Sequence, residues 1–272
     1  MLLAIDIGST NITLGVFSDR ELLHAFRLEA RRDQTSDEYA LALAGLMRLE
    51  QRRRADIESA VLVSVVPRLT PVLLGAARRA FGCVPVVIGP RTDLGLVLAV
   101  DRPEEVGPDR LVNVAAVRQR ALEEAGLSGA GRGHVLSSGT IVVDLGTATT
   151  LDCVSPSGEF LGGVIAPGLR ASLQGLIGRT AKLPEVELSA PPTALGKNTI
   201  DCLRSGLVYG HASAIDGLIE RLRSELPFAS RVLATGGFAR VVAPYTKNLD
   251  SVDPDLTLRG LELIHRRLLA GA

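Results

Sequence analysis

The sequence contains no tryptophan, and aromatic residues make up only 3% of its 272 residues. Stacking platforms for single-stranded nucleic acid or carbohydrate are therefore not expected. The chain also has no excess of charge of either sign, because 30 Lys and Arg residues balance 30 Asp and Glu residues. A neutral chain lacks the basic footprint that a phosphate backbone requires. We therefore expect no nucleic-acid partner.

Cysteine is scarce, and its placement excludes two kinds of site. Cys83, Cys153 and Cys202 are widely spaced, odd in number and form no C-x-x-C pair. Such cysteines fit small buried hydrophobic residues in a reducing compartment better than a disulfide framework. The four histidines are scattered as well, with none at metal-ligand spacing. We expect neither disulfides nor a metal centre built on Cys or His.

Long uncharged runs are also missing, although the mean hydropathy is positive at +0.26. A membrane-spanning helix needs about 18 consecutive apolar residues, and no segment approaches that length. The N-terminal residues MLLAIDIGST have no basic region, and their apolar stretch meets Asp6 at once, unlike a signal peptide. With 46% hydrophobic residues the chain can bury a sizeable core. These features predict a globular cytoplasmic protein with no membrane partner.

The pattern of apolar residues predicts an α/β protein built from two similar halves. In the first half we expect strands at 2–5, 12–17, 22–28, 60–66 and 84–88, with helices at 36–54, 69–81 and from 108 onwards. In the second half we expect strands at 141–143, 160–165 and 232–235, together with an alternating strand that ends at 154. We expect helices there at 169–182, 199–225 and 256–269. A Gly/Ser-rich connector at 126–139 separates lobes of 1–125 and 140–272. We interpret the repeated order as an internal duplication.

Each half opens with the same short motif, Asp-x-Gly-Ser/Thr, directly after an apolar strand. The two aspartates, Asp6 and Asp144, lie 138 residues apart, about half the chain. Glycine at such a bend lets backbone N–H groups approach phosphate oxygens, and aspartates supply hard oxygen ligands for a cation. One such turn alone is more often a plain hairpin turn, because these residues form turns anyway. The symmetric pair favours an ATP site formed by two lobes.

A third candidate element is Ala234-Thr235-Gly236-Gly237-Phe238, which follows a predicted strand. Two glycines would let a flat base or ribose lie against the backbone. Taken alone, a tight strand-to-helix turn explains the segment equally well.

Several motifs together resemble the type III pantothenate kinase family, and they occur in the family's order from end to end. They are DIGST near the start, GPDR at 107–110, DLGTATT at 144–150, GGVIAPG at 162–168, GKNT at 196–199, ATGG at 234–237 and DPDLTLRGL at 253–261. The resemblance implies the fold of the acetate/sugar kinase, heat-shock-70 and actin superfamily. Its members have two duplicated actin-like (ribonuclease H-like) lobes with the ATP cleft between them.

The resemblance also implies a reaction and its partners. Members phosphorylate pantothenate with ATP and Mg²⁺, the first step of coenzyme A biosynthesis. They require potassium or ammonium in addition, and they act as cytoplasmic homodimers with pantothenate bound near the subunit interface. Another small-molecule kinase of the superfamily is one alternative, which a substrate panel would reveal. A non-enzymatic regulator on a kinase fold is the other, which DNA retention without turnover would reveal.

The residue roles that the resemblance implies fall into four groups. Asp109 is the proton acceptor, and Asp144 is the ligand of the monovalent cation. The ATP phosphates are held by Asp6, Ile7, Gly8, Ser9, Thr10, Asn11, Ile12, Thr13 and Thr147. Pantothenate is bound by Val100, Gly107, Pro108, Asp109, Arg110 and Thr199. Ser9 stands where the family usually has Asn, and Val100 replaces an aromatic residue, so its contact would be apolar packing.

Asp109 also has a purely structural explanation. It follows Gly107-Pro108 and precedes Leu111-Val112, which is a natural place for an acidic residue at a helix N-terminus. A carboxylate there can also orient the substrate hydroxyl and accept its proton late in a loose phosphoryl transfer. The two roles are compatible.

Overall fold

The computed structural model describes residues 1–89, 92–127, 134–180 and 182–270, and the chain forms two compact units. The first unit comprises Met1–Gly95, Arg102–Ala116 and Leu256–Ala272. The second comprises Leu96–Asp101 and Val117–Asp255. Each unit is thus assembled from separate stretches of chain, whereas the lobes expected from the sequence were continuous. Part of the expected connector, residues 128–133, lies outside the described residues.

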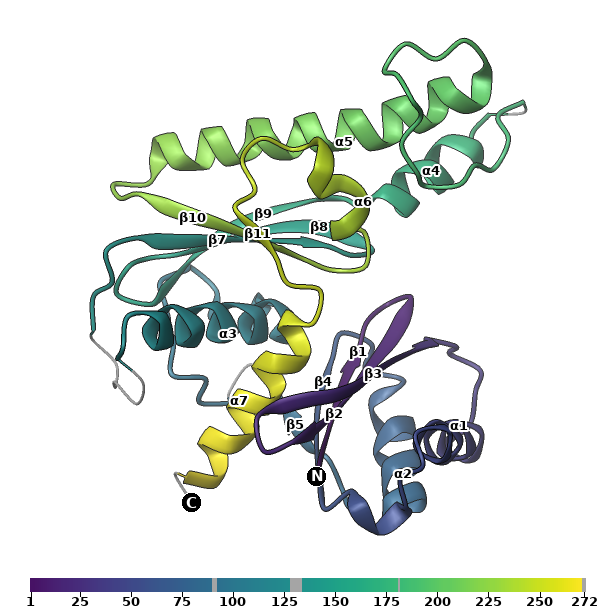
Figure 1. The fold of residues 1–272 in the computed structure, drawn as a ribbon, viewed down its shortest axis with the longest axis vertical. Helices are drawn as coiled ribbons and strands as arrows, with labels where there is room; N and C mark the ends of the chain where they lie inside the picture. The colour runs from purple at the N-terminus through teal and green to yellow at the C-terminus, as the bar shows by residue number, and fades with distance from the viewer. Residues whose placement is uncertain (90–91, 128–133, 181, 271–272) are drawn as a thin grey trace. The chain divides into compact units, whose positions relative to one another are not determined.

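The first unit contains a five-stranded sheet in the order β3-β2-β1-β4-β5 (Figure 1). Its strands are β1 (Leu2–Ile7), β2 (Asn11–Ser18), β3 (Glu21–Glu29), β4 (Ser59–Ser64) and β5 (Val86–Ile88). The first three form an antiparallel meander, while β4 joins β1 in parallel and β5 joins β4 in parallel. The central strand β1 therefore ends at Asp6 and Ile7, directly before the turn into β2.

Helices cover this sheet and supply its core. Helices α1 (Ser36–Leu49) and α2 (Thr70–Phe81) pack against each other, and apolar side chains of both join those of the sheet in one cluster. Helix α7 (Leu256–Ala270) contacts β1, β2 and β4. The start of helix α3 (Pro108–Glu124) meets α7 closely, because a Cβ at Gly260 would lie 2.7 Å from the Val112 carbonyl oxygen.

The second unit repeats the strand order of the first. Its sheet runs β11-β10-β7-β8-β9-β6, built from β6 (Val97–Leu98), β7 (Gly139–Leu145), β8 (Ala148–Val154), β9 (Glu159–Pro167), β10 (Ser230–Thr235) and β11 (Ser251–Val252). Strands β7, β8 and β9 form an antiparallel meander, and β10 and β11 continue the sheet in parallel. The predicted duplication and α/β fold class are confirmed, and β6 is an added edge strand.

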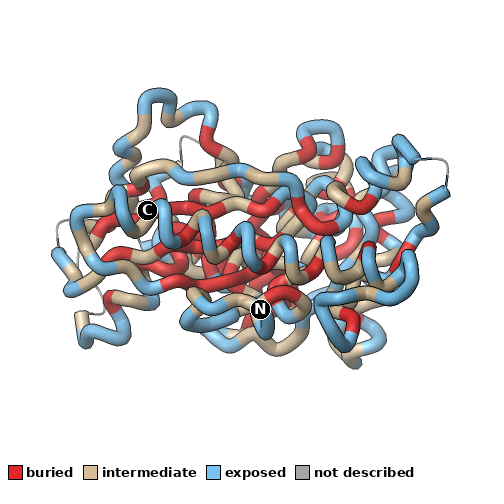
Figure 2. Tube along the Cα trace, turned by 90° about the horizontal axis from the view of Figure 1, so that it is seen from above, coloured by how far each residue is buried: buried red, intermediate tan, exposed pale blue. Residues whose placement is uncertain are grey.

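Helix α5 (Thr199–Glu225) lies along one face of this second sheet, preceded by the short helix α4 (Leu169–Ile177) (Figure 1). Side chains from β7, β8 and β10 pack with Ala212, Ile215 and Ile219 of α5 in one apolar cluster. Long buried stretches alternate with exposed ones along the chain (Figure 2). No helix among the described residues is long and apolar enough to cross a bilayer.

Two predicted helices end earlier than expected. Helix α1 was predicted to reach Arg54 but stops at Leu49, because Gln51 adopts a positive φ of 55° that breaks the helical path. Arg54 instead begins a short 3₁₀ helix, Arg54–Asp56. The helix predicted over 169–182 stops at Ile177, with Gly178 at its C-terminal cap. Helix ends depend on such local backbone conformations, which apolar periodicity does not reveal.

Strand β9 approaches β8 so closely at one residue that only glycine fits. A Cβ at Gly163 would lie 1.8 Å from the carbonyl oxygen of Leu151. The preceding Gly162 has a φ of +100°, and the pairing register shifts beside it, between Cys153 and Val154. The pair Gly162-Gly163 thus serves strand packing.

We predict that Gly163→Ala lowers the free energy of unfolding by more than about 1 kcal/mol, because the backbone oxygen cannot move aside. Gly217→Ala is the matched control: it lies on the exposed side of α5 with nothing within 4 Å of its Cβ. The control should raise stability by about 0.5–1 kcal/mol. Urea unfolding measures both variants, and equal stability of Gly163→Ala and wild type would contradict the close approach.

Candidate functional site

The turn between β1 and β2 presents a short run of polar side chains from a rigid base. The Gly8 N–H donates to the Asn11 carbonyl oxygen at 2.9 Å, which closes the turn. Ser9, Thr10 and Asn11 are exposed, whereas the flanking Ile7 and Ile12 are completely buried. Asp6 lies at the end of β1, opposite Thr13 of β2. The turn therefore offers hydroxyl, amide and backbone groups to solvent from an anchored hairpin, as phosphate-binding turns do.

The turn between β7 and β8 is the counterpart in the second unit, and it is one residue shorter. Gly146 N–H donates to the Ala148 carbonyl oxygen at 3.0 Å, and Gly168 N–H donates to the Thr147 carbonyl oxygen at 3.2 Å. Thr147 is exposed. A Cβ at Gly168 would lie 2.4 Å from the Thr147 carbonyl oxygen, so glycine is required there. The end of β9 thus fixes the backbone of the turn that presents Thr147.

Asp144 lies beside two glycines at the carboxyl end of β7. A Cβ at Gly236 would come within 2.4 Å of the Asp144 Oδ1 atom, and one at Gly146 within 3.5 Å. Gly236 has a φ of +91° and directly follows β10, which pairs with β7. Glycine at 236 therefore leaves room for the carboxylate. The structure brings Asp144, Thr147, Gly168 and Gly236 to one edge of the second sheet.

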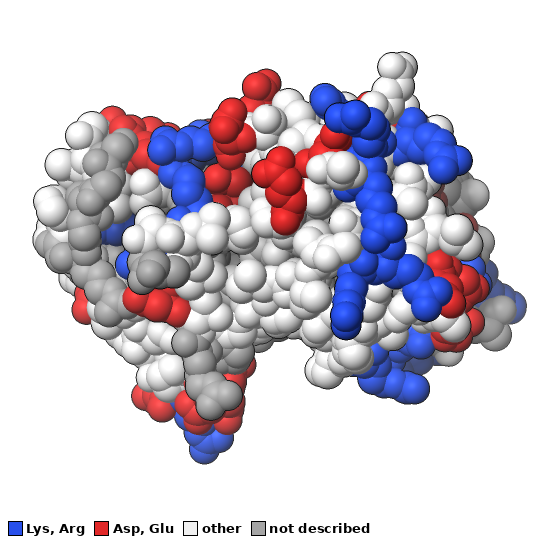
Figure 3. Space-filling model, turned by 90° about the horizontal axis from the view of Figure 1, so that it is seen from below, with Lys and Arg blue, Asp and Glu red and all other residues white. Residues whose placement is uncertain are grey.

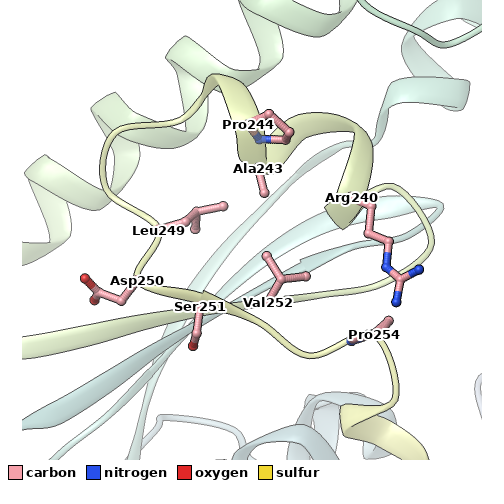
Figure 4. A pocket seen from close by; sticks show the side chains of 8 residues that line it. All are labelled: Arg240, Ala243, Pro244, Leu249, Asp250, Ser251, Val252 and Pro254. Atoms are coloured by element: carbon pink, nitrogen blue, oxygen red, sulfur yellow. The ribbon is translucent and has the colours of Figure 1, made fainter.

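A pocket of about 420 Å³ lies next to helix α6 (Ala239–Val242) and strand β11 (Figure 4). Its walls combine small apolar side chains with one basic and one acidic residue. The lining residues are Arg240, Ala243, Pro244, Leu249, Asp250, Ser251, Val252 and Pro254. Asp250 is engaged in the fold, because its Oδ2 atom accepts a hydrogen bond from the Val232 N–H at 2.7 Å.

Asp109 lies in the first turn of α3 and is only partly accessible to solvent. Its Oδ1 atom accepts the Arg110 N–H at 2.8 Å, as expected of an acidic residue at a helix N-terminus. A Cβ at Gly107 would lie 2.6 Å from the same oxygen. Burial raises the pKa of Asp109, and this outweighs the lowering by the Arg110 N–H and the Arg110 charge. A carboxylate of raised pKa is a better proton acceptor than an ordinary one.

Two further candidate substrate contacts lie in the second unit. Val100 is half-buried after β6, and a Cβ at Gly162 would lie 3.6 Å from its Cγ1 atom. Thr199 is the exposed first residue of α5. The preceding Asn198 caps that helix by accepting the Asp201 N–H at 2.9 Å, so Thr199 is held at a defined helix start.

The described residues contain no group of three or more His, Cys, Asp and Glu side chains suited to hold a metal ion. Mg²⁺ in phosphoryl-transfer sites commonly takes only one or two protein carboxylates, together with phosphate oxygens and water. Asp6 and Asp144 provide hard oxygen donors of that kind. Each carboxylate, taken within its own unit, is of the kind that such a cation uses.

No sequence pattern points to His211 as part of a site. Its Nε2 atom lies 2.9 Å from the Thr149 hydroxyl, which is buried two residues after Thr147. The two residues are 62 positions apart, so no local pattern signals their contact.

Comparison with known proteins identifies the family. Residues 2–221 match the family described as type III pantothenate kinase. The type III pantothenate kinase of Moorella thermoacetica is 42% identical over 98% of this chain and 99% of the relative. That of Myxococcus xanthus is also 42% identical, over 98% of both chains. This chain belongs to the type III pantothenate kinase family. It is accordingly a phosphotransferase of the kinase class, as the motifs indicated.

Solved structures support the predicted fold of the family member described here. A Campylobacter jejuni protein described as a conserved Baf family transcriptional activator superposes with a TM-score of 0.59 at 19% identity, covering 98% of this chain and 99% of that one. Component A of (R)-2-hydroxyglutaryl-CoA dehydratase from Acidaminococcus fermentans gives 0.54 at 14% identity, covering 100% and 99%. At such identities the likeness shows a shared two-lobed α/β fold and nothing about activity.

Proposed function

We propose that this protein transfers the γ-phosphoryl group of ATP to the primary hydroxyl of pantothenate. The product is 4′-phosphopantothenate, and the reaction is the first step of coenzyme A biosynthesis. The observation that carries the proposal is the near full-length relation to curated type III pantothenate kinases. The partly buried carboxylate of Asp109, placed next to the motif's Gly107 and Arg110, supports it.

The two hairpin turns would hold the phosphates of ATP. Backbone N–H groups and side chains of residues 6–13 would bind phosphate oxygens, and the exposed hydroxyl of Thr147 would add a further donor. The backbone at Gly236 and Gly237 would support the ribose or base. Both turns are anchored by buried strands, so they need little ordering when the nucleotide binds.

Asp109 would act on the hydroxyl of pantothenate. In a loose phosphoryl-transfer transition state the nucleophile keeps its proton until late, so the carboxylate first orients the hydroxyl and then accepts its proton. Burial raises the pKa of Asp109, and a carboxylate of raised pKa is a stronger proton acceptor. The neighbouring guanidinium of Arg110 would pair with a carboxylate or phosphate of the substrate.

The remaining substrate contacts would come from Val100, Thr199 and the backbone of Gly107-Pro108. Val100 would contribute apolar packing and Thr199 a hydroxyl. Asp144 would hold a monovalent cation, potassium or ammonium, in addition to the Mg²⁺ that accompanies ATP. Such cations offset the negative charge that the phosphoryl group carries during transfer.

Asp109→Asn should slow turnover strongly without destabilising the fold. Removing the base should lower kcat by about 10²- to 10⁴-fold. Burial raises the folded-state pKa above its ordinary value of 3.8, so the folded protein binds this proton more tightly than the unfolded chain. Above the folded-state pKa, ionised Asp109 therefore lowers the free energy of unfolding. This destabilisation decreases as pH falls and is absent below pH 3.8, the ordinary pKa of the unfolded chain. The Tm of the variant at pH 7.5 should equal or exceed that of wild type.

The control is Glu123→Gln, an exposed carboxylate on the same helix, which should change neither kcat nor Tm. Kinetic assays of pantothenate phosphorylation and thermal unfolding at pH 7.5 and pH 5 measure these effects. Turnover of Asp109→Asn close to wild type would rule out the assigned base.

Turnover should require potassium or ammonium and fail in sodium buffer at equal ionic strength. Asp144→Asn should lower activity in potassium and remove the difference between the two buffers, since the cation loses its carboxylate ligand. Steady-state rates with Mg²⁺ and ATP at fixed ionic strength test this. Equal rates of the wild-type protein in potassium and sodium would eliminate the cation role of Asp144 and leave the reaction in place.

We further propose that the protein acts as a homodimer in the cytoplasm. Support comes from large apolar side chains of the second unit that the single chain leaves exposed, including Leu195 at 78%, Ile165 at 66% and Ile200 at 49%. Covering such side chains in a dimer would remove apolar surface from water, which favours association. Light scattering should give twice the chain mass of 28.7 kDa, and a mass of 28.7 kDa would contradict the dimer.

A further inference from the structure

One polar pair interrupts the apolar interface between α5 and the second sheet. Thr149 is 1% exposed and lies on the same face of β8 as Leu151 and Cys153, which pack in the apolar cluster under α5. Its hydroxyl lies 2.9 Å from the Nε2 atom of His211 on α5. Burial lowers the pKa of His211, so its ring is neutral near pH 7. A neutral ring nitrogen and a hydroxyl satisfy each other's hydrogen-bonding capacity.

The hydrogen bond joins two elements that carry proposed ligand contacts. Thr149 stands at the start of β8, two residues after Thr147 in the turn. That turn closes through the Gly146 N–H and the Ala148 carbonyl oxygen, directly before Thr149. His211 belongs to the helix that begins at Thr199. The phosphate turn and the helix of the proposed pantothenate contact are therefore linked within one unit by a directional bond.

Apolar packing alone would fix the position of the β7–β8 turn relative to α5 less precisely than the hydrogen bond does. Hydrophobic attraction has no preferred direction, whereas a hydrogen bond favours a particular distance and angle between two atoms. Replacing His211 by an apolar residue leaves the buried Thr149 hydroxyl without its bond, which costs more than the bond's net contribution. The pair thus holds the start of β8 at one place on α5.

We propose that His211 is a positioning residue that, through Thr149, holds the β7–β8 turn in its phosphate-binding position relative to α5. This inference rests on the proposed function, because it assigns nucleotide phosphates to that turn. Neither His211 nor Thr149 touches the reacting atoms in this scheme. Loss of the bond should therefore weaken nucleotide binding more than it slows the chemical step.

Two pairs of variants test the bond. Thr149→Val removes the hydroxyl at nearly constant volume, and His211→Leu removes the ring nitrogen. Each should raise the KM for ATP about tenfold, the factor that one hydrogen bond typically contributes, with a smaller change in kcat. Thr149→Ser and His211→Gln keep a polar partner and should restore most of the affinity. The double variant Thr149→Val/His211→Leu should be no worse than either single variant.

A matched control variant distinguishes the positioning role of His211 from a purely structural one. Ile215→Val alters the same apolar cluster one turn along α5 from His211, and such a change costs about 0.5–1.5 kcal/mol. It should lower Tm without changing the KM for ATP. If Thr149→Val and His211→Leu also lower Tm but leave the KM unchanged, the pair only stabilises the fold and the inference is overturned.

Calorimetric binding of a non-hydrolysable ATP analogue separates this inference from the proposed reaction. If wild type binds the analogue but does not phosphorylate pantothenate, the proposed function fails, and weaker binding by the two variants would still uphold the positioning role. Equal analogue affinity of wild type and both variants overturns that role whether or not pantothenate is phosphorylated. Absence of analogue binding by wild type overturns both.

Discussion

The central strand of each sheet pairs differently on its two sides, and both candidate turns depend on this. Strand β1 is antiparallel to β2 and parallel to β4, and β7 is likewise antiparallel to β8 and parallel to β10. The hairpin makes the turn short, while the parallel neighbour ends at the same edge and brings its own following residues there. Gly236 reaches Asp144 for this reason. Duplication of the pairing produces two polar turns on anchored hairpins.

Sequence reasoning succeeded where the determining forces are local. Alternating apolar residues predicted the two hairpins, and turn chemistry placed Asp6, Thr147 and Asp144 at their ends, because side-chain alternation and glycine at a bend are properties of short segments. It failed where distant segments meet. Strand β6 has only two residues and exists because β9 pairs with it, and the bond between Thr149 and His211 needs the fold before it can be seen. The end of α1 was missed because a non-glycine residue, Gln51, takes a positive φ.

Partial burial of Asp109 has opposite effects on the chemistry of the carboxylate and on the stability of the fold. The same partial burial that makes the carboxylate a stronger base also makes its ionised form unfavourable in the folded protein. The helix start compensates in part, because the Arg110 N–H donates a hydrogen bond to the carboxylate.

On the surface, Lys and Arg side chains form a band with Asp and Glu nearby on one face (Figure 3). Neutrality of the whole chain therefore does not mean that its charges are evenly distributed. Local electrostatics at the site therefore cannot be inferred from the net charge.

Helix α7 gives the first unit an unusual dependence on synthesis order. Its residues pack on β1, β2 and β4, yet they follow all of Val117–Asp255 in the chain. While the ribosome is still synthesising the second unit, the apolar surface of the first sheet that α7 covers stays exposed to solvent. Nascent chains with such surfaces are prone to aggregate and are typical clients of chaperones. The unit encoded first is therefore the one whose core is completed last.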